Sequence, residues 1–136
     1  MKTNLLIDTN VLIYAFNQDS DHYNFSISIF SNPNYTLFLT SKNISEFFAV
    51  TSKFKVTLKT SLNFYEDLKI YTKILFPSET SLSIFEKLIQ QYQPKGNQVF
   101  DIEIVSIMLD NGIDQIATFN KKDFDKISEI QILEIP

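Results

Sequence analysis

The sequence predicts an α/β protein with a three-layer α/β/α fold, in which helices cover both faces of a central parallel sheet of about four to five strands. Short apolar runs alternate along the chain with segments whose apolar residues recur every three or four positions, as strands and helices do in this class. Polar residues stand where the apolar runs end, as at the carboxyl edge of a parallel sheet. The length of 136 residues predicts a single domain, 1–136.

The first strand is expected at the apolar run that ends at Asp8, residues 4–8. The other strand candidates are equally short, rich in apolar or β-branched residues and bounded by turn residues. They lie at 35–39, 74–76, 115–119 and 130–135. Parallel neighbours require crossover connections, and these are expected to be right-handed.

Helices are expected between these strands, because capping residues precede apolar residues at helical spacing. Ser20-Asp21 and Thr40-Ser41 are two such caps, and Ser78 or Ser81 is a third. The expected helices lie at 11–16, around 25–30, at 41–51, at 60–73, around 82–89, at 99–109 and, as a single turn, at 123–127.

The residue types exclude several kinds of site. The chain has no Cys and one His, which rules out a disulfide scaffold, a zinc ribbon, a thiol nucleophile and a His-rich metal site. All twelve basic residues are Lys, so no Arg is available to bind a phosphate in the bidentate manner. No signal sequence or membrane-length apolar run is visible, and the lack of Cys fits the cytoplasmic location that we expect.

Five polar side chains are expected to converge at the carboxyl edge of the sheet. Asp8 ends the first strand, and Glu46 lies on the helix after the second. Asp101 stands in the first turn of the helix before a later strand, and Asn120 and Asp123 follow that strand. The sequence thus predicts four carboxylates and one amide around one site.

Carboxylates that are brought together repel one another and resist the loss of their hydration, so a cation stabilises such a cluster. Oxygen ligands without Cys or a spare His favour Mg²⁺ or Mn²⁺ over Zn²⁺. The cation also makes an acidic site compatible with a polyanionic substrate, which weakens the objection that the net charge of −4 raises against nucleic-acid chemistry.

Four sequence blocks, in order and over nearly the whole chain, resemble the PIN domain family. They are LIDTNVLI (6–13), SKNISEF (41–47), GNQVFD (96–101, continuing to Gly112-Ile113) and ATFNKKDF (117–124). The resemblance implies a three-layer α/β/α fold and a metal-dependent endoribonuclease, most similar to the VapC-type toxins of toxin–antitoxin pairs. It therefore implies an RNA substrate and a cognate antitoxin. The surplus of Phe and Tyr also suggests a homodimer interface or an antitoxin groove.

Carried over by position, Asp8 and Asp101 match the principal metal ligands of the family. Glu46 matches its third acidic position, which binds the metal or positions water. Each residue also has a simpler interpretation. Asp8 can be a helix N-cap, Glu46 a solvated helix residue, and Asp101 a carboxylate that stabilises the helix dipole.

The fourth acidic position of the family often falls where Asn120 stands in this chain. The carbonyl oxygen of Asn120 can bind a metal, but an amide cannot act as a carboxylate base. Asp123 either takes over this position or caps the short helix. Thr9, Asn10 and Thr118 are expected to support the acidic cluster.

Other acidic α/β sites fit the sequence less well. A haloacid-dehalogenase-like site needs Asp-x-Asp after the first strand, and this chain has Asp8-Thr9-Asn10. A receiver-like domain needs an Asp at the end of a middle strand, where this chain has Thr40-Ser41. The remaining alternative is a PIN-like module with weak or no catalysis that binds RNA or a partner, and Asn120 is the feature that favours it.

Overall fold

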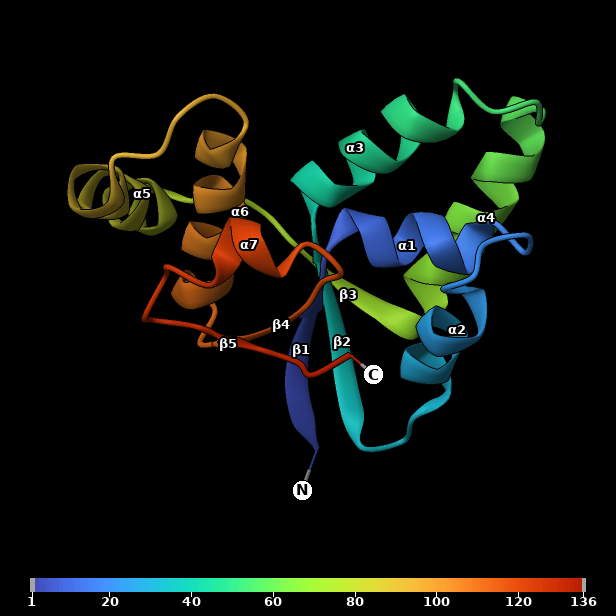
Figure 1. The fold of residues 1–136 in the computed structure, drawn as a ribbon, viewed down its shortest axis with the longest axis horizontal. Helices are drawn as coiled ribbons and strands as arrows, with labels where there is room; N and C mark the ends of the chain where they lie inside the picture. The colour runs from blue at the N-terminus through green and yellow to red at the C-terminus, as the bar shows by residue number, and fades with distance from the viewer. Residues whose placement is uncertain (1, 136) are drawn as a thin grey trace.

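The computed structural model describes residues 2–135 and contains a five-stranded sheet with helices on both faces (Figure 1). The strands are β1 (Thr3–Ile7), β2 (Tyr35–Thr40), β3 (Thr72–Leu75), β4 (Gln115–Ala117) and β5 (Gln131–Ile132). They lie in the order β3-β2-β1-β4-β5, and every neighbouring pair is parallel. The predicted fold class and the parallel sheet are therefore confirmed.

Helices connect the strands and form the two outer layers. They are α1 (Thr9–Phe16), α2 (Tyr23–Ser31), α3 (Ser41–Thr51), α4 (Leu58–Tyr71), α5 (Glu79–Tyr92), α6 (Gln98–Asp110) and α7 (Lys121–Phe124). Helices α1 to α4 lie on one side of the sheet and α5 to α7 on the other (Figure 1). No helix within residues 2–135 has the length and apolar character needed to cross a bilayer.

Strand β1 lies at the centre of the sheet and is buried on both faces. Leu5 and Ile7 pack into the apolar core on the α1 side, which also contains Phe47 of α3. Leu6 points to the opposite face and packs into the core on the α6 side, together with Met108. Because successive side chains of a strand alternate between faces, the segment that is buried on both sides must be apolar, as Leu5–Ile7 is, whereas Thr3 and Asn4 at the start of the strand are exposed.

Two strands pass directly into helices at the carboxyl edge of the sheet. The N–H of Asp8 donates to the carbonyl of Ala117 (3.0 Å), which continues the pairing with β4, while the Asp8 carboxylate caps α1. Thr40 ends β2 and caps α3 in a capping box with Asn43. Since neither connection has a loop, the first turns of α1 and α3 are fixed against the sheet.

The starts of β3 and α2 differ from the sequence prediction. Strand β3 begins at Thr72, two residues before the expected 74–76, because the Thr72 hydroxyl donates to the carbonyl of Leu68 (2.6 Å) where α4 ends. Helix α2 begins at Tyr23, later than a Ser20-Asp21 cap requires. The Ser20 hydroxyl accepts from the N–H of His22 (3.1 Å) in the preceding turn instead.

The C-terminal elements are shorter than the sequence suggests. Helix α7 covers 121–124 and not 123–127, and β5 covers only two residues of the expected 130–135. These segments have too few residues for local preference to define their ends. Their positions depend on buried anchors in the α6-side core, among them Phe124, Ile127 and Ile130.

We expect Phe124→Ala to lower the free energy of unfolding by about 3–5 kcal/mol, because the Phe124 ring is 1% exposed and is the buried anchor of α7. Phe76→Ala is the control, because this ring is 64% exposed and its loss should change stability by less than about 0.5 kcal/mol. Urea denaturation of both variants measures the difference. Equal stability of the two variants would contradict the buried placement of α7.

Candidate active site

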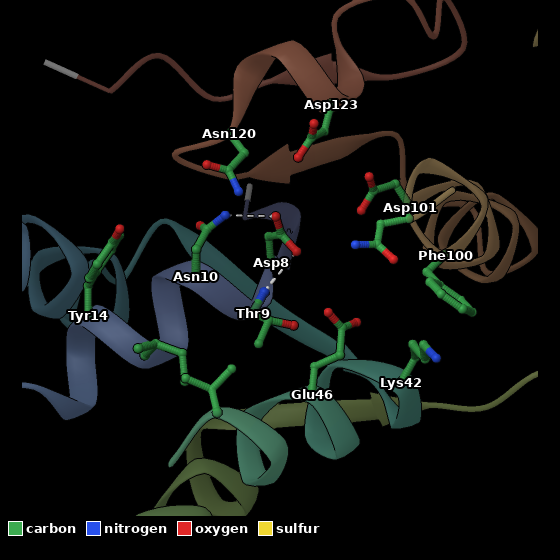
Figure 2. Close-up of a pocket in the computed structure, with 13 residues that line it drawn as sticks. Asp8, Thr9, Asn10, Tyr14, Lys42, Glu46, Phe100, Asp101, Asn120 and Asp123 are labelled. Carbon is green, nitrogen blue, oxygen red and sulfur yellow. Dashed lines mark hydrogen bonds between the residues drawn. The ribbon is translucent and has the colours of Figure 1, made fainter. Parts of the chain in front are cut away.

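A cavity of about 530 Å³ opens at the carboxyl edge of the sheet, between the first turns of α1, α3 and α6 and the segment around α7. The five side chains that the sequence predicted to converge all line it (Figure 2): Asp8, Glu46, Asp101, Asn120 and Asp123. The structure thus brings together residues that lie up to 115 positions apart along the chain, because parallel strands end at the same edge.

Asp8 is the most deeply placed of these carboxylates and is only 7% exposed. It accepts hydrogen bonds from the N–H of Thr9 (2.8 Å), from the Asn10 amide (3.0 Å) and from the Thr118 hydroxyl (2.8 Å). Burial nevertheless raises the pKa of Asp8 above its usual value, and the charge of Asp123 adds to this effect. Asp8 is therefore both the cap of α1 and a buried acid that faces the cavity.

Asn10 and Thr118 connect the start of α1 to the end of β4. The Asn10 amide nitrogen reaches the Thr118 hydroxyl (3.2 Å), and its oxygen accepts from the N–H of Phe119 (3.1 Å). Thr118 is fully buried and also accepts from the N–H of Asn120 (3.0 Å). These contacts hold the Asp8 carboxylate between α1 and the end of β4, and the supporting role in an acidic cluster stays a prediction for Asn10 and Thr118.

Sequence reasoning missed a second connection, which runs through Asn43. This fully buried amide donates to the Thr9 hydroxyl (3.0 Å), and its oxygen accepts from the N–H (2.9 Å) and the hydroxyl (2.7 Å) of Thr40. It joins the β2–α3 junction to the β1–α1 junction and so places Glu46, one turn later on α3, beside Asp8. The Thr40-x-x-Asn43 spacing, typical of a capping box, was the signal available.

Glu46 carries a buried oxygen without a partner. Among residues 2–135, no group forms a hydrogen bond with Glu46 Oε1. Burial raises the pKa of Glu46, the charge of Asp8 raises it further, and Lys42 opposes both effects. An unpaired buried carboxylate oxygen is energetically unfavourable unless a cation reaches it.

Asp101 is the third carboxyl of the site whose pKa is raised. Burial, and then the charges of Asp123, Asp8 and Glu46, raise the pKa of Asp101 to about 7. Its place in the first turn of α6 would by itself favour the charged form, because the helix dipole stabilises a carboxylate there. Desolvation and the three like charges therefore outweigh the helix.

The oxygen-rich lining fits a hard divalent cation. Carboxylates of Asp8, Glu46 and Asp101 face one cavity, and the amide of Asn120 forms no helix-capping hydrogen bond. Within the described chain, no three Asp, Glu or His side chains lie close enough to surround an ion by themselves. A cation here would complete its coordination with water, as Mg²⁺ characteristically does.

Six further residues of the cavity were not singled out from the sequence: Ile13, Tyr14, Lys42, Val50, Asn97 and Phe100. Sequence spacing gave no signal for Tyr14, whereas Lys42 stands in the SKNISEF block one helical turn before Glu46. Asn97 and Phe100 stand within the GNQVFD block, close to Asp101, so their place in the sequence was the available signal.

The chain is thus an α/β protein with an acidic cavity at the carboxyl edge of its parallel sheet. The sequence model of the PIN domain family matches residues 5–130. The chain therefore belongs to the PIN domain family, as the four sequence blocks predicted.

Solved structures share the fold at low sequence identity. VapBC2 from Rickettsia felis, bound to a DNA fragment from its promoter, is 21% identical with a TM-score of 0.75, over 96% of this chain and 98% of that chain. VapBC-1 from nontypeable Haemophilus influenzae is 21% identical with a TM-score of 0.74, over 97% and 98% of the two chains. VapC20 from Mycobacterium tuberculosis, a sarcin–ricin loop cleaving toxin, is 10% identical with a TM-score of 0.73, over 93% and 98%. No curated protein sequence matches the chain significantly.

The raised pKa of Asp101 predicts a pH-dependent stability in the presence of EDTA. Between about pH 4, where an unfolded Asp titrates, and about pH 7, the folded protein binds more protons than the unfolded chain. Stability should therefore fall as the pH rises through this window, and Asp101→Asn should reduce the fall. Because 1 kcal/mol shifts the Tm of a domain this size by about 4 °C, calorimetry at about pH 5 and about pH 8 can resolve it.

Asp21→Asn is the matched control for this measurement, since Asp21 is exposed and does not line the cavity. It should leave the dependence of Tm on pH as it is in the original chain. The same pH dependence in the Asp101→Asn variant would show that this carboxyl does not carry the effect.

Proposed function

We propose that this chain is a metal-dependent endoribonuclease and the VapC-type toxin of a toxin–antitoxin pair, formed by one PIN-like domain. The observation that carries the proposal is the unpartnered buried oxygen of Glu46 in a cavity shared with Asp8 and Asp101. Such an arrangement favours a bound cation over an empty acidic site. Membership of the PIN family supports nuclease chemistry, and the likeness to the loop-cleaving VapC20 supports RNA as the substrate.

In this proposal Asp8 and Asp101 would bind one Mg²⁺ or Mn²⁺ ion, and Glu46 together with Asn120 or Asp123 would complete its shell through water molecules. A divalent ion at that position supplies a Lewis acid for the phosphodiester and lowers the pKa of a water molecule. Asn10 and Thr118 hold the Asp8 carboxylate in one orientation through their hydrogen bonds. Asp123 lies near Asp8 and Asp101 (Figure 2), and its carboxylate can accept the proton of the attacking water, which the amide of Asn120 cannot.

The proposed partners are an antitoxin and a second copy of this chain. The structures with the same fold include VapBC toxin–antitoxin complexes, which supports the antitoxin. Large apolar side chains of α4 are exposed and provide contact surface for such partners: Leu58 (68%), Ile70 (76%) and Tyr71 (65%). We place the activity in the cytoplasm, where an RNA substrate is available.

We expect Asp8→Asn to reduce RNA cleavage by roughly 10²–10³-fold or more, because the variant keeps the size of the side chain and removes its charge. Purified protein is incubated with mixed single-stranded RNA in Mg²⁺, Mn²⁺ or EDTA, and products are resolved on a gel. Cleavage should require the metal. Asp21→Asn, on the exposed surface, should cleave as the original chain does. Full activity of the Asp8→Asn variant would contradict the proposed site.

A second candidate is a PIN-like module with weak or no catalysis that binds RNA or a partner. The observation in its favour is Asn120, an amide where the family often has a carboxylate. Asp123, three residues later, lines the same cavity and has the carboxylate that Asn120 lacks. The two candidates therefore differ in whether Asp123 performs the work of the fourth acidic position.

The pair Asp123→Asn and Asn120→Asp separates these candidates. If Asp123 serves as the fourth acid, Asp123→Asn should lower kcat by roughly 10²-fold, and Asn120→Asp should change it little. If the site is degenerate, the original chain should cleave weakly and Asn120→Asp should raise its activity. Single-turnover cleavage in Mg²⁺, with metal affinity measured by calorimetry, provides the comparison.

A further inference from the structure

The ring of Phe100 is exposed at the mouth of the acidic cavity. It stands in the first turn of α6, immediately before Asp101, and lines the same cavity (Figure 2). The side chain is 46% exposed and belongs to neither apolar core, so its removal would leave no hole in the packing. A large apolar group among carboxylates and a lysine therefore has no evident role in folding.

Lys42 occupies one side of this ring. Its ammonium nitrogen lies 4.2 Å from the Phe100 ring centre, in a cation–π contact, and 3.9 Å from Glu103 Oε1. Glu103, two residues after Asp101 on α6, thus faces Lys42. Within residues 2–135 no second aromatic ring stacks on Phe100, so its exposed surface is free for another planar group.

Asn97 adds a free amide beside the ring. It lies one turn before Asp101 and lines the cavity, but its side chain forms no capping hydrogen bond with α6. An amide presents one acceptor and two donors in a plane, which matches the edge of a nucleobase. The lining of one cavity therefore contains a ring for stacking, an amide for a base edge and a cation.

We infer that Phe100, Asn97 and Lys42 form a subsite for one unpaired nucleobase of an RNA strand, adjacent to the phosphodiester at the carboxylates. Phe100 stacks on the base, Asn97 bonds to its edge, and Lys42 contacts a backbone phosphate. The inference rests on the proposed nuclease function and deepens it, because a base within a duplex has its faces covered by its neighbours. The substrate class is thus single-stranded or looped RNA.

The character of the cavity favours a nucleotide over an apolar peptide as the occupant. Its volume of about 530 Å³ is within the usual range for a small-ligand site. Nine of its thirteen lining residues are four carboxylates, four amide or hydroxyl side chains and one lysine: Asp8, Glu46, Asp101, Asp123, Thr9, Asn10, Asn97, Asn120 and Lys42. Tyr14, the other aromatic residue of the lining, packs against the rings of His22 and Phe119. Phe100 is therefore an aromatic platform in a largely polar site rather than part of an apolar docking face.

The sequence contains no Trp, so Phe100→Trp introduces a single tryptophan fluorophore at this position. Its fluorescence tests directly whether a base stacks there. The variant is combined with Asp8→Asn, so that the RNA stays intact. We expect a short single-stranded RNA of mixed sequence to quench the fluorescence, and the same sequence as a duplex to leave it unchanged. Phe76→Trp, at a ring that is 64% exposed and outside the cavity, is the control that should not respond.

Kinetics separate a stacking role from a structural one. Phe100→Leu keeps an apolar side chain and removes the ring, and it should raise KM for single-stranded RNA on the order of tenfold with little change in kcat. Phe100→Tyr keeps the ring and should retain the original KM. Because residue 100 is exposed, all of these variants should fold, and circular dichroism checks this.

The outcomes distinguish the subsite from the proposed function. RNA cleavage with an unchanged KM in Phe100→Leu, or equal quenching by single-stranded and duplex RNA, would overturn the subsite and leave the nuclease standing. If single-stranded RNA quenches the Phe100→Trp variant but the original chain cleaves no RNA, the subsite is supported and the nuclease function is overturned. A changed oligomeric state in Phe100→Leu with unchanged RNA binding would assign the ring to a protein interface instead.

Discussion

The hydrogen bonds to the buried Asp8 carboxylate are the interaction on which the site depends. Asp8 ends the central strand and begins α1, so its position is fixed by the sheet and by a helix at once. Thr118 and Asn10 reach it from β4 and α1 and determine where its oxygens point. Through Asn43 and Thr9, the same junction also fixes the start of α3 and therefore Glu46.

The site concentrates negative charge in a place where water is partly excluded. Asp8, Glu46 and Asp101 all have a raised pKa, and burial is the largest cause for each. The repulsion between these buried carboxylates opposes folding at neutral pH unless a cation offsets it. The raised pKa values and the expected affinity for a divalent ion therefore have the same physical origin. Lys42 partly compensates, since its charge lowers the pKa of Glu46.

The fold and the site of this family depend on different features of the sequence. Structures at 21% and 10% identity share the whole fold, because it depends on apolar alternation and on strand-to-helix junctions, which many sequences can supply. Catalysis depends on a few side chains at one edge. The amide of Asn120 in the same cavity as the carboxylate of Asp123 is compatible with the fold and bears on the chemistry that we propose for the site.

The sequence by itself determined the order of strands and helices, the parallel sheet and the edge at which Asp8, Glu46 and Asp101 gather. These features follow from local periodicity and from the rule that parallel strands end together. The tertiary structure decided what no local pattern contains. It set the two-residue length of β5, the Asn43 contact with Thr9 across 34 positions, and the pKa of about 7 at Asp101. It also placed Lys42 over Phe100, because such contacts depend on how helices pack on the sheet and on which groups the packing shields from water.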